Sequence, residues 1–408
     1  MRIALLSTVF IGEYGVTRIL ENQLPYLLAD GHQVDLYACD LDRRLVPAGV
    51  RAVRVPTHFR GVALALKAGN YDVVVACTDP FYKIVADLKL DAVTVAYEHG
   101  YIPVELTIPE EREQHRKMVE ARIGEIYPAF TAVVTISRYA AKYIGWPAAR
   151  VLYNGGDHFA KLLPAESQVP AGSDNGTVGS QVPAGLDNGN VGSQVPVGLD
   201  NGNVARRIRI LAVTRYRTTE WLYKGLDDLC RLKKDLGDGY EITVVGGGDA
   251  DTCAKLESAG IDARAAISDP HAMAELYDGC DVLVSFSKCE NFNLPLVEAG
   301  FAHKPALALN VCAHPEVTPF VFESYEGICD YLKKATRETL AADGAKMFQF
   351  VEGRFRSEDN GKKFAALLRE LCPNPAGKRA GCVLGLYRAF WDLRDFVRTR
   401  IYQKLRGR

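Results

Sequence analysis

Residues 281–300 read DVLVSFSKCENFNLPLVEAG, and this stretch decides how the chain folds. Its apolar beginning, Asp281–Phe286, predicts a strand that is buried on both faces of a sheet. Pro295 stands where the first turn of a helix tolerates proline, so we expect a helix over residues 294–302. A strand that leads into a helix through a short polar turn is the unit of an open α/β sheet. Such sheets bind ligands at the carboxyl ends of their strands.

Two carboxylates lie eight residues apart across this turn. Glu290 belongs to the turn and Glu298 to the helix, so the pair could bind two different hydroxyl-bearing parts of one ligand. Two solvated glutamates beside a capped helix would have the same spacing. The spacing alone leaves both interpretations open.

Length and composition favour a globular protein of two domains. The chain has 408 residues, of which 48% are hydrophobic and 24% charged, and its net charge of −1 does not indicate a nucleic-acid partner. Ten cysteines occur without a C-x-x-C pair, which argues against a zinc site or a disulfide framework and favours a reducing cytoplasm. No apolar run is long enough to span a bilayer. The run Ile3–Ile11 predicts a buried first strand rather than a signal peptide.

Short apolar runs alternate with helical patterns, which predicts βαβ units and a parallel sheet in each half of the chain. In the first half we expect strands at Arg2–Thr8, Gln33–Ala38, Tyr71–Cys77, Ala92–Tyr97 and Ala132–Ile136, and helices at Thr17–Ala29 and Ser137–Gly145. After Arg207 the pattern restarts. There we expect strands at Ile208–Thr214, Glu241–Val245, Ala263–Ile267, Asp281–Phe286 and Pro305–Asn310, and helices at 224–236, 251–259, 270–278 and 294–302.

Two segments differ in composition from these halves. Ser167–Gly179, Ser180–Gly192 and Ser193–Ala205 are three near-identical copies rich in Pro, Asn and Gly, which predicts a disordered or turn-rich linker; a small stacked repeat is the alternative. Residues 378–408 contain nine Lys or Arg and two Asp with apolar residues at helical spacing. They predict a basic amphipathic helix that either binds an anionic membrane surface or packs on the protein.

Glycines and cations follow several of the predicted strands. Gly15 comes after the first strand, where glycine lets the backbone approach a phosphate, and Gly246 and Gly247 repeat this signal after Glu241–Val245. The three-glycine pattern of dinucleotide-binding dehydrogenases is absent from the first loop.

Arg215, Arg217 and Lys224 follow the strand at Ile208–Thr214 and suit a diphosphate, although a solvated loop would have the same composition. His99 ends a strand of the first half and faces the same edge, in either a structural or a functional role. Two D-x-D matches, Asp40–Asp42 and Asp249–Asp251, are too short to indicate a metal site, and we expect none.

Taken in order, these segments resemble family 4 of the retaining glycosyltransferases, which have the GT-B fold. The resemblance covers roughly residues 1–160 and 207–372. The motifs that carry it are the Gly15 loop, His99-Gly100, Thr135–Tyr139, Val151–Asp157, Val213–Arg215, Lys224-Gly225, Val244–Gly248, Leu276–Asp281, the E-x7-E pair Glu290/Glu298, Lys304-Pro305 and His314–Glu316.

The GT-B fold implies two Rossmann-like, doubly wound α/β domains that face each other across a cleft. The expected organisation is an acceptor-side domain at 1–160, a low-complexity insert at 161–206, a nucleotide-sugar-binding domain at 207–350, a helix returning to the first domain at 351–372 and a basic tail at 373–408.

The resemblance also implies an activity. A hexose would pass from a nucleotide-diphosphate sugar to a hydroxyl of a glycan, polysaccharide or glycolipid, with retention of configuration, by a front-face mechanism and without a metal or other cofactor. His99, Glu290, Arg215 and Lys224 would be catalytic, the two cations offsetting charge on the leaving group. Further donor contacts would come from Gly15, Arg217, Gly246, Gly247, Phe292, Asn293, Leu294 and Glu298. The basic tail favours a lipid-linked or membrane-proximal acceptor, and hence a cytoplasmic protein that could lie at the membrane periphery.

Three departures from the family pattern qualify these expectations. Asn293 stands where the family usually has glycine, although asparagine tolerates the left-handed region best among other residues. The spacing from Arg215 to Lys224 is longer than usual, so Arg217 is an alternative partner. Tyr14-Gly15 replaces paired glycines. Two alternative functions are open. The first is that of a non-catalytic nucleotide-sugar-binding or scaffold protein, and the second, less favoured, is that of a nucleotide-sugar epimerase.

Overall fold

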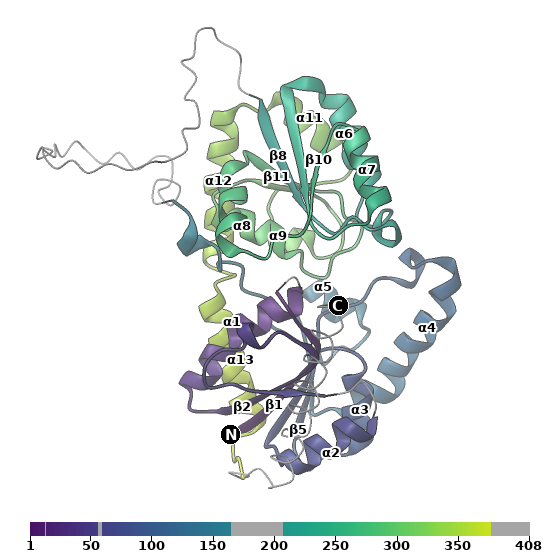
Figure 1. Ribbon diagram of the computed structural model, residues 1–408, viewed down its shortest axis with the longest axis vertical. Helices are drawn as coiled ribbons and strands as arrows, with labels where there is room; N and C mark the ends of the chain where they lie inside the picture. Colours follow the sequence, from purple (N-terminus) through teal and green to yellow (C-terminus); the bar gives the residue numbers. More distant parts are fainter. Residues whose placement is uncertain (13, 56–58, 165–206, 377–408) are drawn as a thin grey trace, which may run out of the picture.

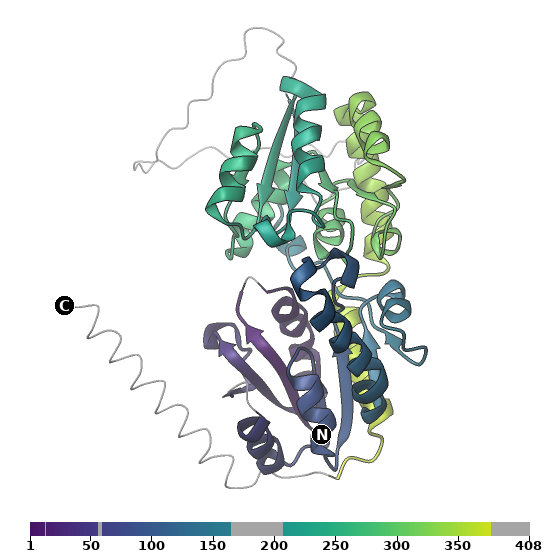
Figure 2. The same cartoon turned by 90° about the vertical axis from the view of Figure 1, so that its right-hand side faces the viewer.

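The computed structural model describes residues 1–12, 14–55, 59–164 and 207–376. They form two α/β domains stacked one above the other, with the purple-to-blue domain below and the teal-to-green domain above (Figures 1 and 2). Most of the low-complexity insert and the basic stretch 378–408 lie outside the described residues. Within the described ranges, no helix is both long and apolar enough to cross a membrane.

The first domain is built on a parallel sheet of seven strands in the order β3-β2-β1-β4-β5-β6-β7. Neighbouring residues of the central strand point to opposite faces, as a pleated strand requires. Ile3 and Leu5 pack into the core on one face, and Ala4 and Leu6 into the core on the other. The strands are β1 (Arg2–Phe10), β2 (Gln33–Leu41), β3 (Arg51–Arg54), β4 (Val73–Ala76), β5 (Val93–Glu98), β6 (Ala132–Thr135) and β7 (Arg150–Val151).

Helices connect these strands and cover both faces of the sheet (Figure 1). They are α1 (Gly15–Ala29), α2 (Phe59–Gly69), α3 (Phe81–Leu88), α4 (Arg112–Ala121) and α5 (Arg138–Tyr143). The parallel pairing of every strand sends all the β-to-α turns to one edge of the sheet.

The second domain has the same architecture, with a parallel sheet of six strands in the order β10-β9-β8-β11-β12-β13. The strands are β8 (Ile208–Val213), β9 (Tyr240–Val245), β10 (Asp262–Arg264), β11 (Val282–Ser285), β12 (Ala306–Leu309) and β13 (Val321–Phe322). The helices are α6 (Leu226–Leu236), α7 (Ala250–Ser258), α8 (Pro270–Gly279), α9 (Leu294–Phe301), α10 (His314–Val317), α11 (Tyr325–Lys334) and α12 (Arg337–Glu352). Two Rossmann-like domains therefore form the fold, as the resemblance implied.

The last described helix, α13 (Ser357–Leu371), leaves the second domain and packs beside α1 of the first (Figure 1). Gln23 of α1 donates to the side-chain oxygen of Asn360 at 2.9 Å in a buried position. Near the end of α13, Glu370 accepts two hydrogen bonds from the guanidinium of Arg150, at 2.7 and 2.8 Å. The chain thus crosses between the domains twice.

Each strand expected from the sequence is present, although its ends differ. The second strand continues three residues beyond Ala38, to Leu41, and the strand expected at Ala263–Ile267 ends at Arg264. Sequence reasoning missed β3, β7 and β13, which have four, two and two residues. Such short strands on the outer side of a sheet carry too few apolar residues to produce a periodic pattern.

Candidate active site

The carboxyl ends of the two sheets meet at the interface between the domains and enclose a cavity of about 270 Å³. Its walls come from both domains. Gly12, Tyr14, Gly15, Arg18, His158 and Phe159 line it from the first domain, and Val213, Thr214, Arg215, Val245, Gly246, Gly247, Ala266, Ile267, Met273, Leu294, Pro295 and Glu298 from the second.

The turn between β11 and α9 adopts the conformation for which the family normally uses glycine. Asn293 is left-handed, with φ +61° and ψ +69°, and immediately precedes the first residue of α9. Its side-chain amide donates to Ser285 Oγ at 3.0 Å and to His314 Nε2 at 2.9 Å. The expectation that asparagine preserves this turn is confirmed, and two hydrogen bonds that glycine lacks accompany it.

His314 is the buried side chain that holds the Asn293 amide in place. The imidazole is fully buried, and because Nε2 accepts from Asn293, Nδ1 carries the proton and donates to the carbonyl of Leu309 at 2.8 Å. Burial lowers the pKa of His314, since a charged ring would lose its hydration. The ring is therefore neutral and fixed in one tautomer.

Glu290, in the turn before α9, forms an ion pair with Lys224, and neither residue is among those that line the cavity. Lys224 Nζ lies 2.6 Å from Glu290 Oε1, and the two side chains are only 11% and 18% exposed. Burial acts to raise the pKa of Glu290, but the attraction and hydrogen bond from Lys224 outweigh it, so the pKa lies below its usual value. Gly225, which follows Lys224, has φ +66° and no room for a side chain, because a Cβ would lie 2.2 Å from the Phe286 carbonyl.

The two arginines of the β8 loop occupy different places. Arg215 lines the cavity and is half-exposed, with its guanidinium 2.7 Å from Glu220 Oε1. Arg217 is exposed and is not among the residues that line the cavity. Arg215 thus lines the cavity, and the guanidinium of Arg217 lies at its margin, 3.7 Å from the position of a Cβ at Gly247.

The glycines singled out in the sequence converge on the same cavity. Gly15 is the first residue of α1, and nothing lies within 4 Å of a Cβ built there. Gly246 lies against the opposite wall, where a Cβ would be 2.0 Å from the Thr214 carbonyl. Gly247 lines the cavity next to it. A ligand can therefore approach backbone on both sides.

Glu298 is held by two side chains that sequence reasoning missed. Its Oε1 lies 3.0 Å from His158 Nε2, and its Oε2 accepts a hydrogen bond from the Tyr277 hydroxyl. Burial and the neighbouring carboxylate raise the pKa of Tyr277 well above its usual value, so it remains a donor. His158 directly follows the Val151–Asp157 motif, and this adjacency was the one available signal.

Of the remaining residues expected to contact a donor, Phe292 lies in the hydrophobic core and Leu294 lines the cavity. Phe292 is buried and packs edge-on against Phe355, with ring centroids 5.5 Å apart. Its ring therefore belongs to the hydrophobic core rather than to the wall of the cavity, and only its backbone is available to a ligand. Leu294 lines the cavity at the start of α9.

His99 follows β5 and lies beside the turn that carries Glu290. Both ring nitrogens are buried and have no hydrogen-bond partner among the described residues. Burial lowers the pKa of His99 to about 3. The contact with the second domain runs through Gly100, which has φ +89°, because a Cβ there would lie 2.1 Å from the Asn291 side chain. Asn291 Nδ2 donates to the Tyr101 carbonyl at 3.4 Å.

A buried ion pair supports the His99 loop. Arg122 donates to Glu98 Oε2 at 2.7 Å, and Tyr127 donates to the same oxygen at 3.0 Å. The other oxygen, Oε1, accepts from the backbone N–H of Gly100 at 3.0 Å. Burial raises the pKa of Glu98 despite the opposing effect of Arg122. Because these partners are far apart in sequence, no local pattern indicated them.

Glu316 links the two domains beside the site. Its carboxylate accepts hydrogen bonds from the backbone N–H groups of Arg138 and Tyr139, at 2.9 and 2.7 Å, and from the Tyr153 hydroxyl at 2.7 Å. The first two donors belong to the N-terminal turn of α5, whose N–H groups lack partners within the helix. A carboxylate of the second domain thus caps a helix of the first.

The two D-x-D matches have local roles. Asp42 binds the Arg44 guanidinium and caps the short helical turn at Arg43–Leu45. Asp249 caps α7 and accepts from the backbone N–H of Thr218 at 2.8 Å. Across the described ranges, no three His, Cys, Asp or Glu side chains are grouped to hold a metal ion.

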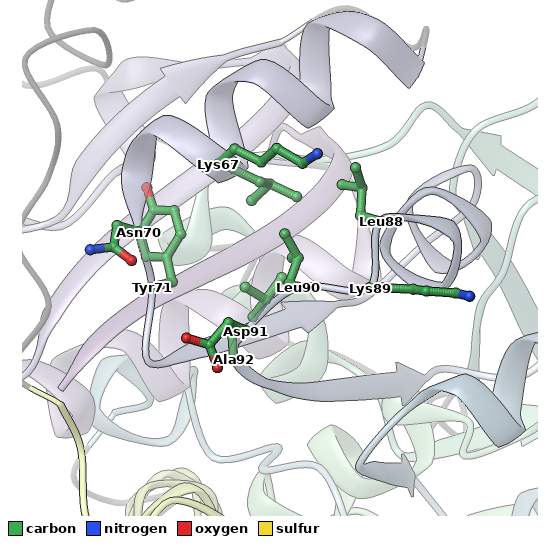
Figure 3. Close-up of a pocket in the computed structure, with 10 residues that line it drawn as sticks. Lys67, Asn70, Tyr71, Leu88, Lys89, Leu90, Asp91 and Ala92 are labelled. Carbon is green, nitrogen blue, oxygen red and sulfur yellow. The ribbon is translucent and has the colours of Figure 1, made fainter.

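Another cavity, of about 240 Å³, lies at the opposite edge of the first sheet (Figure 3). Its lining includes Lys67 and Asn70 at the end of α2 and Leu90 and Asp91 just before β5. This is the amino end of the parallel strands, whereas open α/β sheets bind ligands at the carboxyl ends. The interdomain cavity is therefore the candidate active site.

Comparison with known proteins supports the fold. The HepE protein of Anabaena, crystallised with UDP and glucose, superimposes with a TM-score of 0.66 at 14% identity, covering 91% of this chain and 100% of that one. Sucrose-phosphate synthase of Thermosynechococcus elongatus gives 0.68 at 16% identity, covering 91% and 98%. A glycosyltransferase of Rickettsia africae gives 0.64 at 15% identity, covering 91% and 99%. The search of curated protein sequences found no match.

Family models match both halves of the chain. The Glycosyltransferase Family 4 model matches residues 14–158, and the Glycosyl transferases group 1 model matches residues 207–336. Together they cover more than half of the chain and all of the sequence segments that line the cavity, apart from Gly12 and Phe159. The chain therefore belongs to the family 4-like glycosyltransferases of GT-B fold.

Proposed function

We propose that this glycosyltransferase moves a hexose from a nucleotide-diphosphate sugar to a hydroxyl of a glycan, polysaccharide or glycolipid, with retention of configuration and without a metal ion. The observation that carries this proposal is the interdomain cavity, which reaches two helix N-termini, together with the buried Lys224–Glu290 pair of the second domain. HepE, which shares the fold, was crystallised with UDP and with UDP-glucose.

The diphosphate binds between the two domains. Arg215 lines the cavity, and the N-termini of α1 and α9 open toward it at Gly15 and Leu294. Unpaired backbone N–H groups and the helix dipole attract a phosphate at such a position. Arg215 and Lys224 then offset the negative charge that grows on the leaving diphosphate, which is the task that a metal ion performs in other transferases. Arg217 makes at most a peripheral donor contact.

Glu290 binds hydroxyl groups of the donor sugar. Because Lys224 holds its pKa below the usual value, Glu290 is a carboxylate at neutral pH and accepts hydrogen bonds only. Its role is to position the sugar; no covalent step is assigned to it. In the front-face reaction, the bond from the sugar carbon to the diphosphate oxygen breaks while the acceptor oxygen bonds to the same face. The acceptor's proton passes to the departing phosphate.

His99 serves the reacting sugar from the first domain. With a pKa of about 3 its ring is neutral at physiological pH, so it offers one donor and one acceptor nitrogen. Both nitrogens lack partners within the described part of the protein, and a sugar hydroxyl on each would remove the cost of burying them.

The part of the proposal that concerns the acceptor rests on the sequence alone. The basic residues of 378–408 would bring the enzyme to an anionic membrane surface on the cytoplasmic side and so to a lipid-linked acceptor. Residues 378–408 lie outside the described residues, and the proposal therefore depends on their charge and apolar spacing.

A donor screen tests the proposed activity. The purified protein is incubated with UDP-, GDP- and ADP-hexoses, with and without EDTA, and nucleotide release is measured. We expect release from one donor, unaffected by EDTA and lost in Glu290→Ala. Proton NMR of the released sugar at early times then gives the anomeric configuration. Loss of activity with EDTA, or an inverted anomer, would contradict the proposed mechanism.

A further inference from the structure

Two free cysteines lie close together beside the turn that carries Glu290. Cys289 immediately precedes Glu290 and is buried, whereas Cys312, in the loop between β12 and α10, is partly exposed. The backbone N–H of Ala313 donates to the Glu290 carbonyl at 3.2 Å, and Cys312 Sγ lies 3.6 Å from the Lys288 carbonyl oxygen. These contacts, one on each side of Cys289, hold Cys312 against it.

Three groups donate hydrogen bonds to the Cys312 sulfur. They are the Cys289 thiol, the Tyr139 hydroxyl and the backbone N–H of Glu290. These bonds, above all that from Cys289, lower the pKa of Cys312 although burial opposes them. The same thiol–thiol bond, together with burial, raises the pKa of Cys289. The proton of the pair therefore stays on Cys289, and Cys312 becomes the thiolate.

These contacts distinguish Cys312 from other cysteines that the structure describes. Burial raises the pKa of five of them, which are Cys39, Cys77, Cys230, Cys253 and Cys280. Cys312 also has φ +54°, a left-handed backbone that is uncommon for a residue other than glycine. The thiolate is the nucleophilic form of cysteine. An accessible thiolate beside a second thiol is the arrangement of a redox-sensitive pair.

We propose that Cys312 and Cys289 form a reversible oxidation site for hydrogen peroxide, at which a disulfide displaces the Glu290 turn. The Cys312 thiolate attacks one peroxide oxygen, the O–O bond breaks, and hydroxide leaves as Cys312 becomes a sulfenic acid. The Cys289 sulfur then attacks the sulfenic sulfur. An S–S bond forms, the S–O bond breaks, and the hydroxyl leaves with the Cys289 proton as water. Two thiols thus give two electrons to one peroxide, and a dithiol reductant restores them.

The disulfide would act on residues that the proposed function uses. A covalent bond is shorter than a hydrogen-bonded contact between two thiols, so the backbone at Cys289 or at Cys312 must move. Glu290 is the next residue in the chain and is paired with Lys224. Tyr139, which bonds to Cys312, belongs to α5 of the first domain. Oxidation should therefore lower donor turnover, and this part of the proposal rests on the proposed function.

Mass spectrometry of the full-length protein tests the disulfide itself. The reduced protein is treated with hydrogen peroxide, free thiols are alkylated, and the chain is cleaved after Lys, Arg and Glu, which separates residues 289–290 from 299–316. We expect the two fragments to be joined after peroxide treatment and separate after reduction with dithiothreitol. If both cysteines remain alkylated, or if Cys312 is oxidised without being joined to Cys289, the proposal is wrong.

Two variants separate the roles of the cysteines. In Cys289→Ala the second thiol is missing, so Cys312 should stop at the sulfenic acid and react with dimedone. Cys312→Ser should keep the turnover of the reduced wild type and lose the response to peroxide. Cys253→Ser, at a partly exposed cysteine of α7, is the matched control and should respond as the wild type does. The wild-type fragments decide the matter even if a variant does not fold.

Turnover separates this proposal from the proposed function. In the wild type we expect peroxide to lower donor turnover about tenfold or more, because a small displacement of a positioning group is that costly, and dithiothreitol to restore it. If the disulfide-linked protein turns over the donor like the reduced protein, the disulfide does not displace the Glu290 turn and the proposal is wrong on that point. If the reduced protein turns over no donor, the proposed function fails, and the joined fragments still test the oxidation site.

Discussion

The two sides of the candidate active site are built differently. On the second-domain side, His314 and Asn293 satisfy each other, and Lys224 pairs with Glu290. On the first-domain side, both ring nitrogens of His99 are buried, and neither has a hydrogen-bond partner within the described residues. A site whose polar groups already have protein partners is fixed before a ligand arrives, whereas an unpartnered group gains its hydrogen bonds only from a ligand.

Because the two sides differ, we expect substitutions on them to have different effects on stability and activity. Changes on the fixed side should reduce both stability and activity. Changes at His99 should reduce activity and leave stability intact or improved.

The largest effect is expected for Lys224→Met. This substitution leaves the Glu290 carboxylate buried without its cation and removes a positive charge from the proposed diphosphate site. We expect turnover to fall roughly 10²–10³-fold and the free energy of unfolding to fall by about 1–3 kcal/mol. Donor turnover and urea denaturation measure the two. Lys83→Met, at an exposed i,i+4 pair with Asp87, is the control; unchanged turnover in Lys224→Met would remove Lys224 from the mechanism.

The second prediction concerns His99→Phe. If the ring nitrogens bind the reacting sugar, turnover should fall about 10²-fold. Stability should not fall, because the substitution removes two buried nitrogens that have no partner in the described protein. Kinetic assays and thermal unfolding of the same preparation give both values. A clear loss of stability would show that His99 has a structural role, and the contrast between the two sides would not hold.

A smaller effect is expected at Asn293, where the family glycine can be restored. Asn293→Gly suits the left-handed backbone but loses the bonds to Ser285 and His314, so we expect a loss of about 1 kcal/mol. Asn293→Ala loses the same bonds and is also strained at positive φ, so its loss should be greater by about 1 kcal/mol. Urea denaturation of the two variants measures the difference. Equal stability of wild type and Asn293→Gly would mean that the amide bonds contribute nothing net.

The smallest effect is a difference in the pH dependence of stability. The pKa of His99 falls from an ordinary 6.5 to about 3 in the folded protein. Between these values the unfolded chain binds a proton that the folded protein does not, so this histidine lowers stability as the pH falls below about 6.5. His99→Phe should therefore lose less stability than the wild type between pH 6.5 and 5. Parallel pH profiles of the melting temperature would contradict the burial of a neutral ring.

The sequence predicted most of the fold and the second-domain side of the site. Strands buried on both faces give unbroken apolar runs, and the turn from β11 to α9 is contained in 20 consecutive residues, 281–300. The left-handed Asn293 was expected from the resemblance, because the family usually has glycine at this position. The pattern missed β3, β7 and β13, because their pairing depends on the neighbouring strand rather than on their own composition.

What the sequence by itself determined is therefore local: which segments are strands, which turns carry glycine, and that Glu290 and Glu298 flank one helix start. Only the tertiary structure decided the long-range contacts. It brought His158 to Glu298, Glu316 to the start of α5 and α13 to α1, and it selected Arg215 rather than Arg217 for the cavity. The physical reason is that periodicity and turn chemistry act over a few residues. Contacts between domains depend on how two folded cores pack against each other. Residues far apart in sequence share no pattern from which such a contact could be predicted.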